Sequence, residues 1–215
     1  MNSSLTYKRL TKILCLLAVL VLTVGTLCAC SKEGVYRIDS FTWISGESIG
    51  TKIAYTYTED SKPDTVTVEH PFSYEESYTD KYEYNKRGNL TTVTRVFNTG
   101  AVHTYTADKI TNYKYILYDK DKKEYLTIVF DHSGFIVSER YANGYVTEYG
   151  FSYDENGKPL SMKQLSVTPS GSNKTIDYIA RFTDANTYRL YPSGEEKTEK
   201  DEYYEVKFQM IEVKG

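Results

Sequence analysis

A row of tyrosines offers the clearest recognition chemistry in this sequence. Tyr145, Tyr149 and Tyr153 are spaced four residues apart, with Thr147 and Phe151 at the positions between them. In an extended strand all five side chains lie on one face. Tyrosine rings stack on sugar rings and also form adaptable contact surfaces for proteins. Two interpretations follow: a ligand-contact stripe formed by Tyr145, Tyr149 and Tyr153, or a row of core residues packed against a neighbouring layer.

The residues that usually bind metals are scattered along the chain. His70, His103 and His132 lie in separate segments, whereas a structural metal site brings four ligands together. The oxygen-rich segments 119–121 and 154–157 lack the twelve-residue ligand pattern of a calcium-binding EF-hand loop. We therefore expect no metal and no cofactor.

Catalytic motifs are also missing from the sequence. It contains neither a Gly-x-Ser-x-Gly nucleophile elbow nor a glycine-rich phosphate loop. The 29 acidic residues allow many carboxylate pairs, but none is singled out for glycoside hydrolysis. We predict that the protein is not an enzyme.

Strands are the elements that must position the tyrosines. At positions 204–210, Tyr, Val, Phe and Met alternate with Glu, Lys and Gln, and similar runs occupy 113–117, 126–130 and 176–182. This period of two is typical of half-buried strands, and tyrosine is frequent enough to do much of the packing. The sequence predicts one all-β domain over residues 35–215, an antiparallel meander of repeated hairpins in a twisted open or spiral sheet.

Turns rich in Asn, Asp and Gly separate these runs. We predict turns at 85–89, 98–100, 131–134, 142–144 and 154–157, and further turns at 62–64 and 192–194. The polar, proline-containing segment 168–173 predicts a long loop.

An internal repeat spans several of these turns. Residues 82–90 match residues 151–160 with one inserted residue, and a weaker copy begins at Phe130. The pattern Tyr-x-Tyr-[Asp/Asn]-x-x-Gly-Asn-Leu resembles the YD (Rhs-type) repeat, over about a third of the chain after residue 29. This resemblance implies hairpins in a spiral sheet and a link to carbohydrate binding. The shell that long family members build around toxins is not expected here, because this chain is too short.

The first 29 residues have the composition of a secretion signal. Lys8, Arg9 and Lys12 precede the apolar run 13–22. The uncharged stretch up to Cys30 is about 17 residues, at or below the ~20 that span a membrane comfortably. The alternatives are an uncleaved membrane anchor and ordinary cleavage without lipid.

The end of this segment, Leu27-Cys28-Ala29-Cys30, resembles the bacterial lipobox. This resemblance implies that Cys30 receives a diacylglycerol and becomes the first residue of the mature protein. Two acyl chains suffice for stable anchoring, and residues 30–34 form a tether that reaches less than roughly 20 Å. We expect the domain to be anchored to a membrane on its extracytoplasmic face, at the cell surface or in the periplasm.

Composition narrows the choice of partners. Removal of residues 1–29 takes away three cations and no acid, so the net charge falls from −3 to −6, which argues against nucleic acid as a partner. Cys15 and Cys28 leave with the signal, so the remaining chain cannot form an intramolecular disulfide. We expect a binding or interaction module of the cell envelope, with a glycan or a protein as its ligand. The alternative is a structural envelope lipoprotein with no small-molecule ligand.

Overall fold

The computed structural model describes residues 34–45, 48–154, 159–184, 186–193 and 202–212. Within these ranges the chain forms fourteen β-strands and one short 3₁₀ helix, so the predicted all-β class is confirmed. The predicted signal at 1–29, Cys30 and most of the turn at 154–157 lie outside the described residues. No helix in the described ranges is long and apolar enough to cross a membrane.

Each strand is antiparallel to the next one along the chain, which confirms the predicted meander of hairpins in one domain. The strands are β1 (Gly34–Ser45), β2 (Ser48–Tyr57), β3 (Pro63–Glu69), β4 (Tyr78–Tyr84), β5 (Leu90–Phe97), β6 (Val102–Lys109), β7 (Lys114–Tyr118), β8 (Glu124–Phe130), β9 (Ile136–Tyr141), β10 (Val146–Tyr153), β11 (Pro159–Val167), β12 (Asn173–Asp184), β13 (Thr187–Pro192) and β14 (Tyr203–Glu212). The 3₁₀ helix η1 (Tyr74–Glu76) lies in the connection between β3 and β4.

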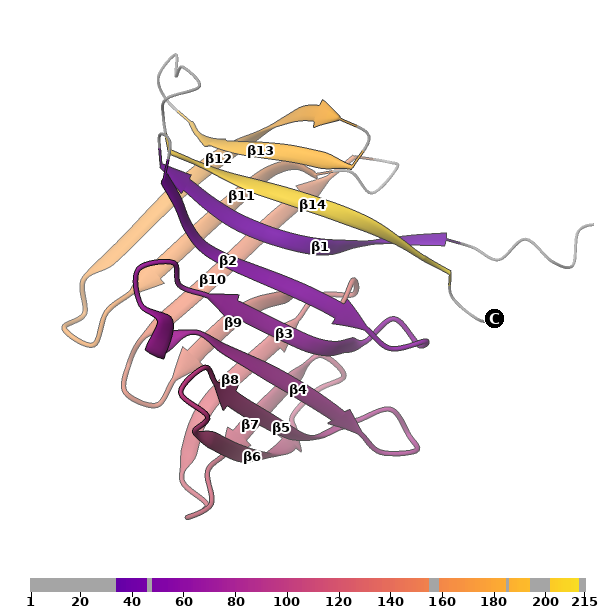
Figure 1. The fold of residues 1–215 in the computed structure, drawn as a ribbon, viewed down its shortest axis with the longest axis vertical. Helices are drawn as coiled ribbons and strands as arrows, with labels where there is room; N and C mark the ends of the chain where they lie inside the picture. The colour runs from indigo at the N-terminus through magenta and orange to yellow at the C-terminus, as the bar shows by residue number, and fades with distance from the viewer. Residues whose placement is uncertain (1–33, 46–47, 155–158, 185, 194–201, 213–215) are drawn as a thin grey trace, which may run out of the picture.

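The sheet closes on itself, because β14 pairs with β1. Their register runs from Gly34 opposite Glu212 to Ile44 opposite Tyr203. The expectation of an open or spiral sheet is therefore wrong, and the strands form a closed barrel (Figure 1). Closure pairs the backbone groups that two edge strands would otherwise leave unpaired.

The two ends of the barrel differ. One end, which we call the mouth, holds the connections from β1 to β2, β3 to β4, β5 to β6, β7 to β8, β9 to β10 and β11 to β12. The opposite end, the base, holds the start of β1 at Gly34, the end of β14 at Glu212 and the remaining described turns.

One kind of five-residue turn recurs at both ends. In the turn at 85–89, the Asn85 N–H donates to the Asn89 carbonyl (3.0 Å), and the Gly88 N–H donates to the Asn85 carbonyl (2.8 Å). Gly88 has φ +72°, a left-handed conformation that glycine adopts without strain. The same backbone hydrogen bonds occur at 58–62, 97–101, 119–123, 131–135, 141–145 and 168–172. This type I turn followed by a left-handed residue is a common hairpin loop.

These turns confirm the ones predicted at 85–89, 98–100, 131–134 and 142–144. The turn expected at 62–64 lies instead at 58–62, and Pro63 is the first residue of β3. A proline is tolerated at that place because its missing N–H is not needed at the start of a strand.

The long loop expected at 168–173 is also wrong, since the chain makes the same tight turn there. Pro169 occupies the second position of a type I turn, which proline favours. Gly171 supplies the left-handed residue, with φ +82°. The polar composition of this segment therefore reflects turn chemistry and not length.

The internal repeat corresponds to hairpins at the base. Residues 82–90 cover the β4–β5 hairpin, the copy that begins at Phe130 covers the β8–β9 hairpin, and residues 151–160 cover the ends of β10 and β11. The copies therefore lie along the same end of the barrel: the β6–β7 hairpin separates the first copy from the second, and the second and third lie in adjacent hairpins.

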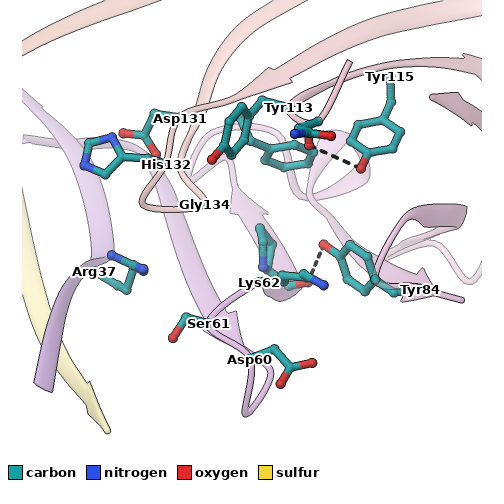
Figure 2. Close-up of a pocket in the computed structure, with 14 residues that line it drawn as sticks. Arg37, Asp60, Ser61, Lys62, Tyr84, Tyr113, Tyr115, Asp131, His132 and Gly134 are labelled. Carbon is teal, nitrogen blue, oxygen red and sulfur yellow. Dashed lines mark hydrogen bonds between the residues drawn. The ribbon is translucent and has the colours of Figure 1, made fainter. Parts of the chain in front are cut away.

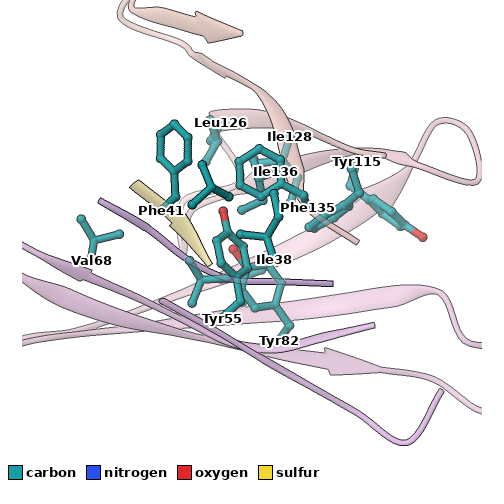
Figure 3. Packing of buried hydrophobic residues seen from close by; sticks show 14 of the residues in the cluster. Ile38, Phe41, Tyr55, Val68, Tyr82, Tyr115, Leu126, Ile128, Phe135 and Ile136 are labelled. Atoms are coloured by element: carbon teal, nitrogen blue, oxygen red, sulfur yellow. The ribbon is translucent and has the colours of Figure 1, made fainter. Parts of the chain in front are cut away.

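Aromatic and apolar side chains fill the space between the walls of the barrel. Phe41 of β1 stacks on Tyr204 of β14, with ring centres 4.4 Å apart, and contacts Phe135 at 6.0 Å. Phe135, which precedes β9, also contacts Tyr55 of β2 at 5.4 Å. Side chains from opposite walls therefore meet inside the barrel (Figure 3). A circular barrel with this many strands would be wide inside, so these contacts show that the barrel is flattened.

Tyrosine supplies a large part of this core, as expected from its abundance. The fully buried cluster includes Tyr55, Tyr82, Tyr105, Tyr115, Tyr178 and Tyr188. Each ring buries a large apolar area while its hydroxyl can still reach a polar partner. For example, the Tyr178 hydroxyl donates to Gln164 Oε1 (3.1 Å).

The outer wall carries charged pairs between neighbouring strands. Lys52 of β2 lies 3.8 Å from Glu69 of β3, and Lys163 of β11 lies 3.5 Å from Asp177 of β12. All four side chains are exposed. The alternation along each strand thus separates a charged outer face from an apolar inner face, as in sheets with one solvated side.

Candidate functional site

A cavity of about 700 Å³ lies inside the mouth of the barrel. Seven of its lining residues are tyrosines, namely Tyr55, Tyr78, Tyr82, Tyr125, Tyr141, Tyr145 and Tyr149. Its ionisable lining residues other than tyrosine are His70, Glu76, Asp80, Arg95 and Glu139. Ligand sites typically measure about 300–1,000 Å³ and combine aromatic walls with a few polar groups. The size and lining of this cavity both fit that description.

An ion pair crosses one wall of the cavity. Asp80 of β4 and Arg95 of β5 are directly opposite each other in the sheet, and both side chains point inward. The Arg95 Nε donates to Asp80 Oδ1 (2.8 Å), and Nη2 donates to Oδ2 (2.7 Å). Both side chains are buried. This two-pronged geometry is the strongest that a guanidinium and a carboxylate can form.

Arg95 is also held by two tyrosines. Its Nη1 donates to the Tyr125 hydroxyl (3.2 Å), and its guanidinium carbon lies 3.7 Å from the centre of the Tyr78 ring. Burial alone would lower the pKa of Arg95, but the hydrogen bonds to Asp80 raise it well above its usual value. The guanidinium is therefore always charged, and all three of its nitrogens are already engaged inside the wall.

Glu139 is a second inward carboxylate in the cavity. It lies on β9, opposite Ile128 of β8 and Thr147 of β10. Its Oε1 accepts one long hydrogen bond from the Tyr141 hydroxyl (3.5 Å). Among the residues that the structure describes, no Lys, Arg or His lies within ion-pair distance of it. Burial raises the pKa of Glu139, and the charge of Arg95 only partly opposes this effect.

The tyrosine hydroxyls around Glu139 are neutral donors. Burial is the main cause that raises the pKa of Tyr78, Tyr82 and Tyr149 above its usual value, and the negative charge of Glu139 adds to the shift. These hydroxyls therefore keep their protons at any physiological pH. Each can donate a hydrogen bond to a ligand, while its ring offers a face for stacking.

Asp80, Arg95 and Glu139 follow a sequence pattern that the sequence predictions did not use. Each occupies an inward position between two apolar or aromatic residues of the same strand: Asp80 between Tyr78 and Tyr82, Arg95 between Val93 and Phe97, and Glu139 between Val137 and Tyr141. A charge at an inward position costs free energy unless it is paired or used. Charges that interrupt an apolar face are therefore the signal that would have found this site.

Tyr149 and Tyr153 of the predicted tyrosine row lie on the inner face of β10, and Tyr145 directly precedes this strand. Tyr149 packs against Phe41 and Phe135, with ring centres 5.4 Å and 6.0 Å away, and lines the cavity. Tyr145 lies at the rim, 51% exposed, and lines the cavity as well. Tyr153 lies toward the base and stacks on Phe151 (5.9 Å). The row is thus not one exposed stripe, and a ligand in the mouth would meet Tyr145 and Tyr149 but not Tyr153.

A second, smaller cavity of about 200 Å³ lies at the base, between hairpins (Figure 2). The Lys62 ammonium lies 5.4 Å from the centre of the Tyr84 ring. The Tyr115 hydroxyl donates to the Asn112 carbonyl (3.5 Å). Asp131 uses its Oδ1 to accept the N–H groups of Ser133 and Phe135 in its own turn. The contact between Lys62 and Tyr84 joins the turn after β2 to β4, whereas the other two lie within single turns. The cavity is small for a ligand site.

The three histidines occupy separate places. His70 Nδ1 lies 3.0 Å from the Thr51 hydroxyl at the rim, His103 packs on Phe97 of the neighbouring strand, and His132 packs on Tyr153 near the base. Within the described ranges, no group of three or more His, Cys, Asp or Glu side chains is close enough to hold a metal ion.

No protein-family model matches this sequence, and no curated protein sequence matches it. A barrel fold by itself does not imply an activity.

Proposed function

We propose that this protein is a lipid-anchored, extracytoplasmic binding protein of the cell envelope, and that the mouth cavity holds its ligand. The observation that supports the proposal is a cavity of about 700 Å³ walled by tyrosines, with buried charged groups converging on it. A barrel core built only for stability would be filled with side chains. Here the base holds a cavity of only about 200 Å³, whereas the mouth half leaves about 700 Å³, which is room for a small molecule.

The position of Gly34, the first residue of β1, favours an orientation in which the mouth faces away from the membrane. Gly34 begins β1 at the base, four residues after Cys30, which would carry the lipid. Those residues reach less than roughly 20 Å, so a lipid on Cys30 would hold the base near the membrane. The mouth, at the other end of the strands, would then open away from the membrane toward ligands arriving from outside.

The lining favours a small, ring-shaped or flexible ligand, such as a glycan unit, over a folded protein partner. Tyr78, Tyr82 and Tyr149 offer aromatic faces and hydroxyl donors, the combination that suits sugar rings. This lining fits the link to carbohydrate binding that the resemblance to the YD repeat implies. That this chain belongs to the YD-repeat family is part of the proposal. The protein would act by binding and not by catalysis.

A neutral fluorescent reporter tests the cavity. N-Phenyl-1-naphthylamine brightens when it enters an apolar site, and we expect it to bind the wild type. Thr147→Trp should abolish this signal, because Thr147 lines the cavity and the indole would fill it. Thr104→Trp, at an exposed position of β6, is the matched control and should leave binding unchanged. Equal binding by both variants, or none by the wild type, would favour the structural lipoprotein without a ligand.

The lipid anchor has its own test. Cys30→Ala should abolish metabolic labelling with a radioactive fatty acid and should leave unprocessed precursor in the membrane fraction. Mass spectrometry of the wild-type N-terminus should show a diacylglycerol on Cys30. An unmodified cysteine there, or an intact residue 1, would contradict the proposed anchoring without affecting the cavity.

A further inference from the structure

The charges inside the mouth cavity do not balance. Asp80 and Arg95 neutralise each other through two hydrogen bonds. Glu139 has no such partner among the described residues, and it faces the same cavity. A carboxylate kept in an apolar site costs free energy unless something compensates it. Glu76, the other acidic residue of the lining, is exposed in η1 at the edge of the mouth. Glu139 is therefore the carboxylate inside the barrel that is left for a ligand to meet.

Tyrosines from several strands line the same cavity as Glu139. The negative charge of Glu139 contributes to raising the pKa of five of these tyrosines, namely Tyr55 of β2, Tyr78 and Tyr82 of β4, Tyr141 of β9 and Tyr149 of β10. Tyrosine faces attract cations through the negative side of the ring. Tyr78 already holds the Arg95 guanidinium at 3.7 Å. The site thus combines one carboxylate with the rings that organic cations prefer.

An anionic ligand fits this cavity poorly. Arg95, the arginine among the described lining residues, already directs Nε and Nη2 to Asp80 and Nη1 to Tyr125. An anion that approached the two remaining N–H groups of Arg95 would meet a charge that Asp80 already neutralises, and Glu139 in the same cavity would repel it. A cation, by contrast, would leave the Asp80 pair intact and would relieve the burial of the Glu139 charge.

We infer that the mouth cavity binds the ammonium group of a small organic cation, with Glu139 as its counter-ion and the surrounding tyrosine rings as its cage. This inference rests on the proposed function, because it names the ligand class of the same cavity. An amino sugar, a polyamine and a quaternary ammonium compound all carry the required group. The chemistry of the site is the same for each, and the experiment distinguishes them.

Calorimetric titrations of charged and neutral compounds test the inference. Choline is compared with 3,3-dimethyl-1-butanol, its uncharged analogue of the same shape, and glucosamine is compared with glucose; spermidine represents the polyamines. Each is titrated into the wild type, into Glu139→Gln and into Glu83→Gln. Glu83 is an exposed residue of β4, so its variant loses the same charge away from the cavity. N-Phenyl-1-naphthylamine binding reports whether each variant keeps the cavity.

We expect at least one ammonium compound to bind the wild type about tenfold or more tightly than its neutral counterpart does, a typical effect of a buried charge pair. Glu139→Gln should remove this preference and still bind the naphthylamine, whereas Glu83→Gln should behave as the wild type. No binding of any ammonium compound, or a preference that survives Glu139→Gln, would overturn the inference. If the wild type still binds the naphthylamine in that case, the inference fails but the proposed binding function does not.

Discussion

Arg95 binds Asp80 through two hydrogen bonds from the directly opposite position of the neighbouring strand, inside the barrel and beside the cavity. The Arg95 guanidinium lies in an aromatic wall, and the Asp80 carboxylate neutralises its charge. The guanidinium also contacts the Tyr78 ring and donates to the Tyr125 hydroxyl. The wall on this side of the cavity is therefore electrically neutral, whereas Glu139 has no cation within ion-pair distance among the described residues.

Loss of one partner of this pair should be costly. Asp80→Asn leaves a buried guanidinium without its counter-charge, and we expect a loss of about 3–5 kcal/mol of unfolding free energy, measured by urea denaturation. Asp177→Asn breaks the exposed pair with Lys163 and should change stability by only about 0–1 kcal/mol. Similar losses in the two variants would show that the inner pair is not effectively buried.

Glu139 should lower the stability of the protein at neutral pH. Burial raises the pKa of Glu139 in the folded state above its value in the unfolded chain. The folded state therefore favours the protonated form, so this residue's contribution is most favourable at low pH and is lost as the pH rises through the raised pKa. Glu139→Gln mimics the protonated form and should be more stable than the wild type at pH 7.

The advantage of Glu139→Gln should shrink as the pH is lowered toward 4, where the wild-type carboxyl is itself protonated. Urea midpoints of both proteins at pH 4 and pH 7 measure this. Glu83→Gln controls for the change in net charge, since Glu83 is exposed. An advantage that does not depend on pH would mean that the amide stabilises the site for a reason other than charge.

Two glycines in the same kind of turn should respond differently to alanine. Gly134 and Gly100 both have left-handed backbone, with φ +81° and +86°. A left-handed alanine costs about 1–2 kcal/mol in each turn. At Gly134 the added Cβ would also lie 3.2 Å from Pro63 Cδ and 3.3 Å from the Ser61 carbonyl, whereas at Gly100 nothing lies within 4 Å. We therefore expect Gly134→Ala to lower the melting temperature more than Gly100→Ala, and equal effects would mean that the base hairpins are not packed together.

Phe135 should be a major contributor to the stability of the barrel. It is 1% exposed and contacts Phe41 of β1, Tyr55 of β2 and Tyr149 of β10. Phe135→Ala should cost about 3–5 kcal/mol in urea denaturation, because the lost contacts leave a cavity between opposite walls. Phe72→Ala, at a position that is 84% exposed, should stay within about 0.5 kcal/mol of the wild type. A small effect at Phe135 would contradict a flattened, filled barrel.

Local patterns in the sequence were sufficient to predict the strands and several of the turns. Alternation over 204–210 and 126–130 predicted β14 and β8, because the two faces of a strand see different surroundings. Gly88 and Gly134 marked turns because only a left-handed residue closes this hairpin loop. The segment 168–173 does not form the long loop that its polarity predicted, because Pro169 and Gly171 suit a tight turn.

The candidate site was harder to predict, because it depends on which strands face each other. The sequence pointed to the face of β10 that holds Tyr145 and Tyr149, and this face does line the cavity. It did not single out Glu139 or Arg95, since charges are frequent throughout the chain and most lie on the outer wall. Their inward positions become clear only when they are compared with the apolar residues two positions away in the same strand.

The sequence by itself determined the repeating hairpin, in which strands of alternating polar and apolar residues are joined by turns that need a left-handed residue. Each of these requirements is met within a few consecutive residues. Tertiary structure alone decided that the hairpins close into a barrel, since Gly34 and Glu212 become neighbours only after every intervening strand has paired in register. Closure also decided that the inner faces enclose a cavity in which Glu139 stands without a counter-charge. The free energy of a buried charge depends on the opposite wall as much as on its own strand, and no local pattern specifies that wall.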